Sequence, residues 1–231
     1  MGMADAFPQP YPPTYPPDLP DETVFYVDME DLGNKGIDHV GGNHVTWTGA
    51  TNIKKPYGNS KYFNGGGGYG SVSNTPSIDI TTAPFSCFAW IKPDSASPTT
   101  GYIFSKNITA LSDMQYGMYW STSLALNVVL NSSTQTIGGT VPSGVWSLVG
   151  FAVDGVNLFQ YINGKYLLAP VTYSTFPLTE RSTGIEIGRR KTNNALFKGS
   201  MGEIWIIKDA LKLSGVHDLF NETAWKYGVK I

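Results

Sequence analysis

Short runs of β-branched and aromatic residues recur along the chain from Thr23 onward, and glycine or asparagine separates many of them from the next run. Val, Ile, Thr, Phe, Tyr and Trp favour strands, whereas Gly and Asn favour turns. Strands are predicted at 23–27, 44–48, 84–93, 101–106, 115–121, 123–131, 145–153, 157–162, 184–189 and 200–207. This density of strands predicts an all-β protein.

Residues 84–93, PFSCFAWIKP, predict a strand at the centre of that protein. Phe85, Cys87 and Ile91 lie on one face of it, and Phe88 and Trp90 lie on the other. A strand that is apolar on both faces is covered on both sides. We therefore expect packed layers rather than a single exposed sheet.

Two local signals complete the secondary structure. Asn163-Gly164 separates FQYI from KYLL, and a dipeptide that tolerates positive φ at both positions predicts a tight hairpin. One helix is expected near the C-terminus. Its apolar positions Val216, Leu219, Phe220 and Thr223 are spaced i, i+3, i+4 and i+7, with Ser214 as the expected N-cap.

Composition excludes several classes of protein. A formal charge of −2 provides no electrostatic attraction for nucleic acid or for an anionic membrane. No apolar run reaches the length that membrane insertion of a helix requires. Cys87 is the only cysteine, so neither an intrachain disulfide nor a thiolate zinc site is possible. The first residues, MGMADAFPQPYPP, lack a basic and then apolar signal sequence. We therefore expect synthesis without a signal peptide, and either a cytoplasmic location or export as part of a virion or other extracellular assembly.

Residues 1–22 form a separate segment, in which FPQPYPPTYPPDLP spans 7–20. Proline fixes φ and removes a backbone donor, so this segment predicts an extended arm or linker rather than a helix or central strand. It is either a tail or a docking arm. Phe7, Tyr11 and Tyr15 favour the second alternative, with other protein subunits as the partners.

Ten short segments carry a resemblance to a known family, and the match as a whole extends over roughly residues 23–220. They are Phe63-Asn64-Gly65, Ala89-Trp90-Ile91-Lys92-Pro93, Ile103-Phe104-Ser105-Lys106, Gly144-Val145-Trp146, Val153-Asp154-Gly155, Tyr161-Ile162-Asn163-Gly164-Lys165, Ile187-Gly188-Arg189, Phe197-Lys198-Gly199, Glu203-Ile204-Trp205-Ile206 and Ala210-Leu211. In the order of these segments the chain resembles the laminin-G-like domains of the concanavalin A-like lectin/glucanase superfamily.

The resemblance implies that residues 23–231 form a jelly roll, a sandwich of two curved antiparallel sheets. Members of the superfamily bind glycans or proteins, often carry a structural calcium, and in a minority of cases hydrolyse glycosides. The final strand often begins with an acidic pair, whereas here Gly202 precedes Glu203.

The sequence offers no catalytic carboxylate pair. Glycoside hydrolysis needs two carboxylates across the sugar bond, and the strand motif Glu-x-Asp-x-x-Glu is absent. We therefore expect a protein that is not an enzyme, with a diverged glycoside hydrolase as the weaker alternative. The acidic residues Asp28, Glu30 and Asp31 predict either a solvated turn or a calcium site. In the second case Asp28 and Glu203 supply oxygen ligands.

Aromatic residues of the strand 115–121 are candidate ligand platforms. Tyr116, Met118 and Trp120 point to one face and Tyr119 points to the other. Large aromatics usually belong to the core, and Tyr119 and Trp120 are the two that we expect to bind a glycan if either is exposed. The sequence as a whole predicts a non-catalytic adhesion module, displayed on an assembly such as a phage-type virion as a decoration or fibre protein. The alternative is a stand-alone soluble lectin.

Overall fold

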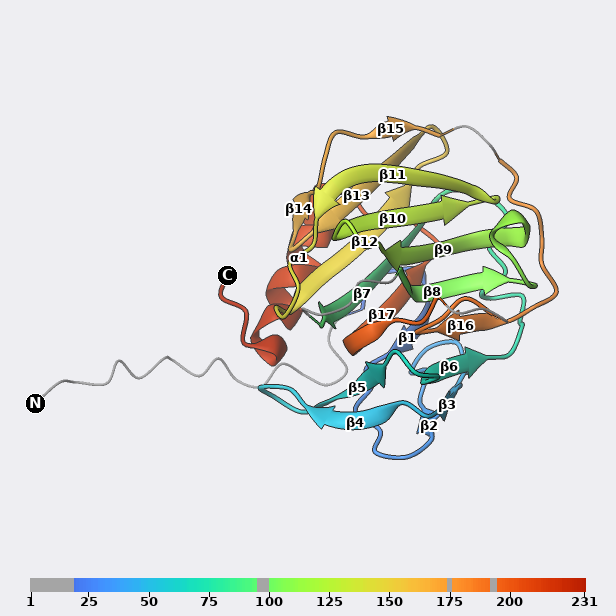
Figure 1. The fold of residues 1–231 in the computed structure, drawn as a ribbon. Coiled ribbons are helices and arrows are strands. Elements are labelled where there is room, and N and C mark those ends of the chain that lie inside the picture. Colours follow the sequence, from blue (N-terminus) through green and yellow to red (C-terminus); the bar gives the residue numbers. More distant parts are fainter. Residues whose placement is uncertain (1–18, 95–99, 174–175, 192–194) are drawn as a thin grey trace, which may run out of the picture.

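The computed structural model describes residues 19–94, 100–173, 176–191 and 195–231, with the side chains of all of these except 135–138. Phe7, Tyr11 and Tyr15 of the predicted arm lie outside the described residues. The described part is a sandwich of two antiparallel sheets, as the sequence predicts (Figure 1).

Sheet A contains nine strands among the described residues. Seven follow one another across the sheet, β1 pairs with β17, and β15 pairs with β13. In spatial order they are β14 (Lys165–Tyr166), β13 (Asn157–Ile162), β12 (Ser147–Val153), β7 (Phe85–Pro93), β17 (Lys198–Ile207), β5 (Asn59–Asn64) and β4 (Thr51–Lys54), with β1 (Thr23–Val27) and β15 (Val171–Thr172) at the side.

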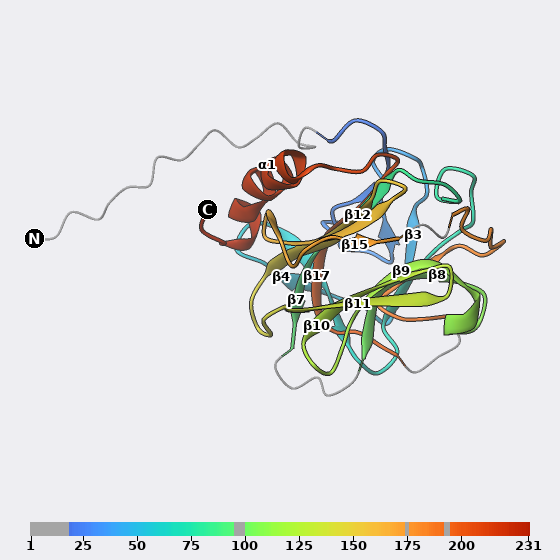
Figure 2. The same cartoon turned by 90° about the horizontal axis from the view of Figure 1, so that it is seen from above.

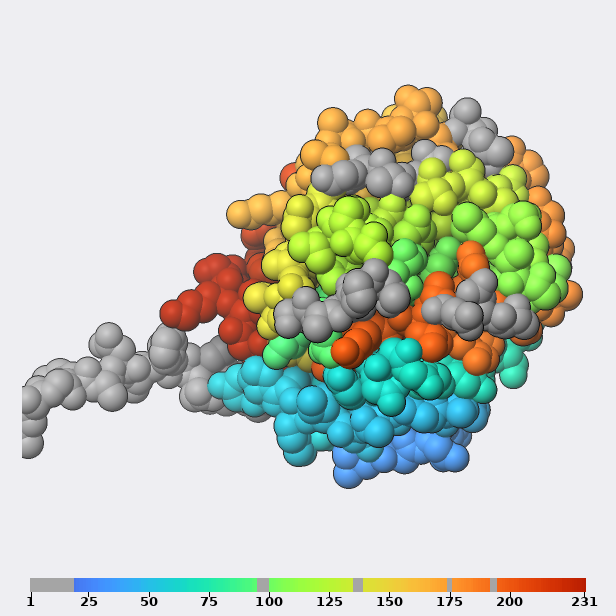
Figure 3. Space-filling view, in the orientation of Figure 1, coloured from blue at the N-terminus to red at the C-terminus, as the bar shows by residue number. Residues whose placement is uncertain are grey.

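Sheet B contains eight strands of the described chain. Their spatial order is β11 (Ser133–Thr140), β10 (Ala125–Leu130), β9 (Met114–Trp120), β8 (Gly101–Asn107), β16 (Ile185–Ile187), β6 (Tyr69–Val72), β3 (Val45–Thr48) and β2 (Lys35–Gly36). A 3₁₀ turn, η1 (Leu111–Asp113), joins β8 to β9. Residues of β8 to β10 form the green part of the face seen in Figure 3.

The main core lies between the sheets. From sheet A, Phe85, Cys87 and Ile91 of β7 point into it, and from sheet B, Tyr116 and Met118 of β9 meet them. All five are fully buried. Both sheets thus place alternate residues inward, as a two-layer sandwich requires.

A second apolar cluster covers the outer face of sheet A. Phe88 and Trp90 of β7 pack there against the helix α1 (Leu213–Ala224) and the 3₁₀ turn η2 (Trp225–Tyr227). Figure 2 shows α1 on the side of sheet A that faces away from sheet B. This arrangement explains why β7 is apolar on both faces, and it confirms the prediction of a central strand.

The C-terminal helix is confirmed, and its apolar positions face sheet A as predicted. The predicted cap is wrong. Ser214 lies inside the helix, whose N-cap is Lys212, and no side-chain hydrogen bond caps this end. The predicted hairpin is correct: Asn163 and Gly164 join β13 to β14 with φ values of 48° and 75°.

Candidate functional site

The two aromatic residues predicted as ligand platforms lie on opposite faces of β9. Trp120 is a correction, because it is only 1% exposed and belongs to the core between the sheets. Its indole nitrogen donates to the Val141 carbonyl at 3.3 Å. Trp120 shares its face with Tyr116 and Met118, and this is the face that sheet B buries.

Tyr119 lies on the outer face of sheet B and is partly exposed. Its ring centroid is 5.0 Å from that of Tyr102, and the pair packs near Met114 and Val129. The guanidinium of Arg190 lies 5.6 Å from the Tyr102 ring. Tyr119 is therefore one side of a small aromatic cluster rather than an isolated platform.

The predicted calcium ligands hold other partners. The carboxylate of Asp28 lies 3.0 Å from His39 Nε2, and that of Glu203 contacts the Lys226 ammonium and accepts from the hydroxyls of Tyr26 and Tyr227 at 2.8 and 3.1 Å. Burial raises the pKa of Asp28. No group of three or more His, Cys, Asp or Glu side chains suited to a metal occurs in the described part of the chain. Asp28 and Glu203 therefore do not fit a calcium site, because their oxygens already have internal partners.

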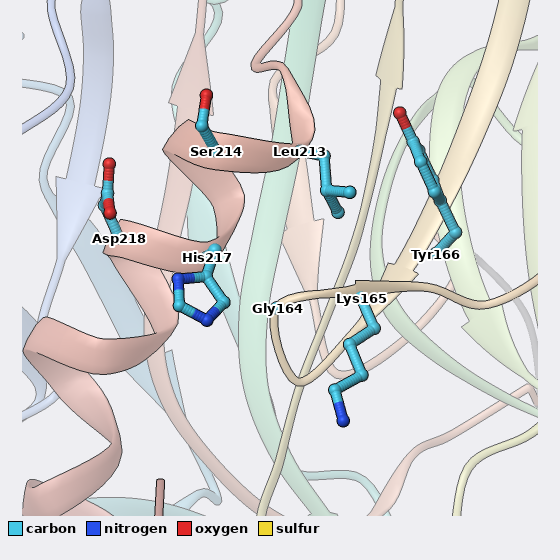
Figure 4. A pocket seen from close by; sticks show the side chains of 7 residues that line it. All are labelled: Gly164, Lys165, Tyr166, Leu213, Ser214, His217 and Asp218. Carbon is cyan, nitrogen blue, oxygen red and sulfur yellow. The ribbon is translucent and has the colours of Figure 1, made fainter.

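A hollow lies between the β13–β14 hairpin and the start of α1 (Figure 4). It has a volume of about 620 Å³. The residues that line it are Gly164, Lys165, Tyr166, Leu213, Ser214, His217 and Asp218. The side chain of Leu213, the first residue of α1, extends into the space between the helix and Tyr166, so the hollow is mainly apolar at its centre (Figure 4).

A second hollow, of about 410 Å³, lies beside the first, and Tyr166 lines both. The segment between β17 and α1 forms one of its walls. The residues that line it are Pro84, Asp154, Phe159, Tyr161, Tyr166, Asp209, Ala210, Leu211 and Lys212. We call the two hollows together the Tyr166 groove.

Buried neighbours hold the groove in shape. Tyr161 is 1% exposed, and its hydroxyl donates to the Leu211 carbonyl at 3.1 Å. Burial raises the pKa of Tyr161, and the neighbouring Tyr166 adds to this rise. Ser86 of β7 donates to the Asp209 carbonyl at 2.7 Å and accepts from the Leu211 N–H at 2.9 Å. The wall of the groove is therefore fixed to two strands of sheet A.

Tyr166 is the exposed member of a group of three rings. It is 43% exposed, and its ring stacks on that of Tyr161 with centroids 5.2 Å apart. Phe159 lies 6.0 Å away on the same side of the sheet. Packing against these rings restricts Tyr166, so it presents a flat apolar surface with little loss of side-chain entropy on binding.

Two exposed carboxylates lie in the same hollow as Tyr166. Asp154 accepts from the backbone N–H groups of Asn157 and Val156 at 2.7 and 2.8 Å, and these bonds hold its pKa below the ordinary value. Asp209 accepts from the Ala210 N–H at 2.8 Å. An aromatic face beside carboxylate acceptors and the amine of Lys212 is suited to a ligand that has both an apolar face and hydroxyl groups.

The family of the chain follows from its sequence. A model of the concanavalin A-like lectin/glucanases superfamily matches residues 64–217, which is more than half of the chain. The chain belongs to this superfamily. Comparison with curated protein sequences found no match.

Three solved structures share the architecture of this chain at low sequence identity. The binding domain of Paraclostridial Mosquitocidal Protein 1 has a TM-score of 0.72 and is 15% identical, with 91% of this chain and 56% of that chain covered. Domain 4 of AbnA, an extracellular arabinanase from Geobacillus stearothermophilus, was solved in complex with arabinotriose. It has a TM-score of 0.65 and is 20% identical, with 86% of this chain and 98% of that chain covered. A Trypanosoma rangeli sialidase has a TM-score of 0.67 and is 13% identical, with 88% of this chain and 33% of that chain covered. This chain thus spans about half of the first structure and about a third of the third.

Sequence reasoning missed the Tyr166 groove. One signal was present, because the hairpin at Asn163-Gly164 places Tyr166 two residues beyond the turn, directly opposite Tyr161 in the β13–β14 register. Only the packing of α1 brings Leu213 and His217 to that hairpin.

Proposed function

We propose that this chain is a non-catalytic adhesion module that binds a glycan in the Tyr166 groove and is held in a larger assembly by its N-terminal arm. The observation that carries the proposal is the exposed ring of Tyr166, supported by Tyr161 and Phe159, with Asp154 and Asp209 in the same hollow. An aromatic ring binds the C–H face of a sugar, and carboxylates accept hydrogen bonds from its hydroxyls.

The size of the groove supports an oligosaccharide as the ligand. The volumes of its two hollows, about 620 and 410 Å³, both fall within the range of about 300–1,000 Å³ that is usual for ligand sites. Because they meet at Tyr166, adjacent sugar rings would occupy one hollow each. The structure of AbnA domain 4 supports the proposal, since that domain has a similar fold and was solved in complex with the short glycan arabinotriose.

The electrostatics of the groove argue against hydrolysis. A glycosidase needs one carboxylic acid whose pKa is raised, so that it is protonated when it meets the leaving oxygen. Asp154 is exposed and its pKa is lowered by the backbone N–H groups of Asn157 and Val156. We therefore expect no turnover of β-glucans, galactans or host polysaccharides. Hydrolysis that stops on replacement of Asp154 or Asp209 would contradict this part of the proposal.

Display on a virion or similar extracellular assembly extends the proposal to the arm. Phe7, Tyr11 and Tyr15 within a proline-rich segment supply apolar area of the kind that contacts other subunits.

A glycan array with the intact chain tests the proposed ligand. Tyr166→Ala should weaken binding to every bound glycan by at least about tenfold, the equivalent of about 1.4 kcal/mol, while Tyr166→Phe keeps most of the affinity. Tyr57→Ala is the matched control, because Tyr57 is 52% exposed but lines neither hollow. Unchanged binding by the folded Tyr166→Ala variant would place the glycan elsewhere, and the Tyr119 cluster would then be tested in the same way.

A further inference from the structure

Four lysine side chains are buried among the described residues, which is unusual for a residue type that is almost always exposed. Lys55 and Lys226 each contact a glutamate, Glu30 and Glu203 respectively. The ammonium groups of Lys61 and Lys106 differ from these, because most of their partners are neutral oxygens.

Lys106 lies in β8, and its side chain is fully buried. Its ammonium donates to the side-chain oxygen of Asn74 at 2.6 Å and to the carbonyls of Arg181 and Thr183 at 3.0 and 2.5 Å. Residue 74 follows β6, and residues 181 and 183 precede β16. The ammonium thus joins the loop after β6 and the loop before β16 to strand β8.

A fourth oxygen completes the group around Lys106. Asp79 Oδ1 lies 3.5 Å from the ammonium, is buried, and has no hydrogen-bond partner among the described residues. An ammonium has three protons, and Asn74, Arg181 and Thr183 already accept them. Asp79 therefore acts on the ammonium mainly through its charge, and its proximity opposes the lowering of the Lys106 pKa by burial.

Lys61, in β5 of sheet A, has a similar set of oxygens around its ammonium. Its ammonium donates to the carbonyls of Asp31 and Gly33, both at 2.9 Å, and to the side-chain oxygen of Asn52. It also lies 5.5 Å from the ring of Trp47. Here one buried cation joins the loop between β1 and β2, and strand β4, to strand β5.

Carboxylate, amide and carbonyl oxygens on loops are the ligand set of calcium in proteins. Around Lys106 an amide oxygen, a carboxylate oxygen and two backbone carbonyls converge. The carboxylates of Asp28 and Glu203, in contrast, already pair with His39 and Lys226. We propose that the Lys106 ammonium takes the place of a structural divalent cation, so that the native domain needs no calcium and removal of this side chain opens a calcium site. A small side chain at 106 leaves room for the waters that complete six to eight ligands.

Thermal unfolding of the intact chain tests the proposal with two variants. Lys106→Ala removes the ammonium and leaves space, whereas Lys106→Met removes the charge and fills the space. Both should unfold at lower temperature than the native chain. Calcium at about 10 mM should raise the melting temperature of Lys106→Ala by about 3–6 °C, if the affinity is near that of weak extracellular sites at about 1 mM. Lys106→Met should not respond.

The controls separate calcium binding from general salt effects. Magnesium at the same concentration should raise the melting temperature of Lys106→Ala less than calcium does, because magnesium requires a smaller, octahedral set of ligands and loses its bound water reluctantly. The native chain and Lys208→Ala, which removes an exposed lysine outside the Tyr166 groove, should each keep the same melting temperature in calcium and in chelator. If Lys106→Ala does not fold alone, recovery of folded protein only in calcium supports the proposal, and recovery in neither condition overturns it. An equal response of Lys106→Ala and Lys106→Met to calcium also overturns it, as does loss of native stability on chelation.

Discussion

The ammonium of Lys226 contacts the carboxylate of Glu203, and both side chains are almost completely buried. Glu203 belongs to β17, which lies next to β7 in sheet A, and Lys226 belongs to η2 near the end of the chain. Tyr26 of β1 and Tyr227 of η2 donate their hydroxyls to the same carboxylate. This network fixes the last turn of the chain to sheet A.

Loss of Lys226 should therefore destabilise the whole domain. Removal of one partner of a buried pair leaves the other charge unpaired, which costs about 3–5 kcal/mol. Lys226→Met should lower the free energy of unfolding by an amount in this range, measured by denaturant titration. The double variant Lys226→Met with Glu203→Gln should recover part of the loss, because no charge remains. An equal loss in both variants would contradict a role for the charge.

Trp120 and Tyr119 should respond differently to truncation, since the structure places one inside the sandwich and one outside. Trp120→Ala empties a core position and should cost about 3–5 kcal/mol. Tyr119→Ala should cost about 1 kcal/mol, because Tyr119 is partly exposed and loses mainly its contact with Tyr102. Unfolding of both variants by urea gives the comparison. Similar losses would mean that Tyr119 is also part of the core.

Asp154 should make a small, pH-dependent contribution to stability. The backbone N–H groups of Asn157 and Val156 lower its pKa below 3.8, the ordinary value. A carboxyl whose pKa is depressed in the folded state contributes stability above its unfolded pKa, and this contribution is lost as the pH falls through the folded pKa. Titration by NMR should give a midpoint below 3.8. The difference in melting temperature between native protein and Asp154→Asn should shrink between pH 5 and pH 3, and a difference that grows there would contradict the assignment.

The fold could be predicted from sequence where local pattern and tertiary packing agree. Residues 84–93 and Asn163-Gly164 specified a central strand and a hairpin by local chemistry alone. Strands such as β4 and β6 were missed. All four residues of β4 are exposed, and β6 begins Tyr-Gly, so neither has the apolar alternation that marks a half-buried strand.

The candidate site was harder to predict, because it depends on contacts between distant segments. Tyr119 and Trp120 could be assigned to opposite faces from period alone, but the sequence does not state which face the sandwich buries. The same limit applies to Glu203. The sequence does not show that its carboxylate is paired with Tyr26 of β1 and Lys226 of η2, which are distant in the chain. The Tyr166 groove arises from the hairpin, the helix and the segment between β17 and α1, which no short motif connects.

The boundary between arm and domain bears on the last prediction. Leu19 packs against the apolar cluster under α1, and the Pro20 carbonyl accepts from the Thr23 N–H at 3.2 Å. The domain thus begins a few residues before β1, and residues 19–22 belong with it rather than with the arm. A truncation that leaves the fold intact should remove residues 1–18 only.

Deletion of residues 1–18 should leave the melting temperature of the domain nearly unchanged and abolish incorporation into the assembly. Ordering a backbone costs about 1–2 kcal/mol per residue, and proline lowers this cost by restricting the free chain beforehand. Phe7, Tyr11 and Tyr15 add apolar area that a flexible spacer has no need to carry, because Gly and Ser serve that purpose. The triple variant with serine at these three positions retains the length and the prolines, and it should fail to incorporate as the truncation does. Tagged native, truncated and triple-serine chains are compared in the purified assembly. Normal incorporation of the truncated chain would mean that the segment is a tail, and normal incorporation of the triple-serine chain alone would assign docking to the prolines.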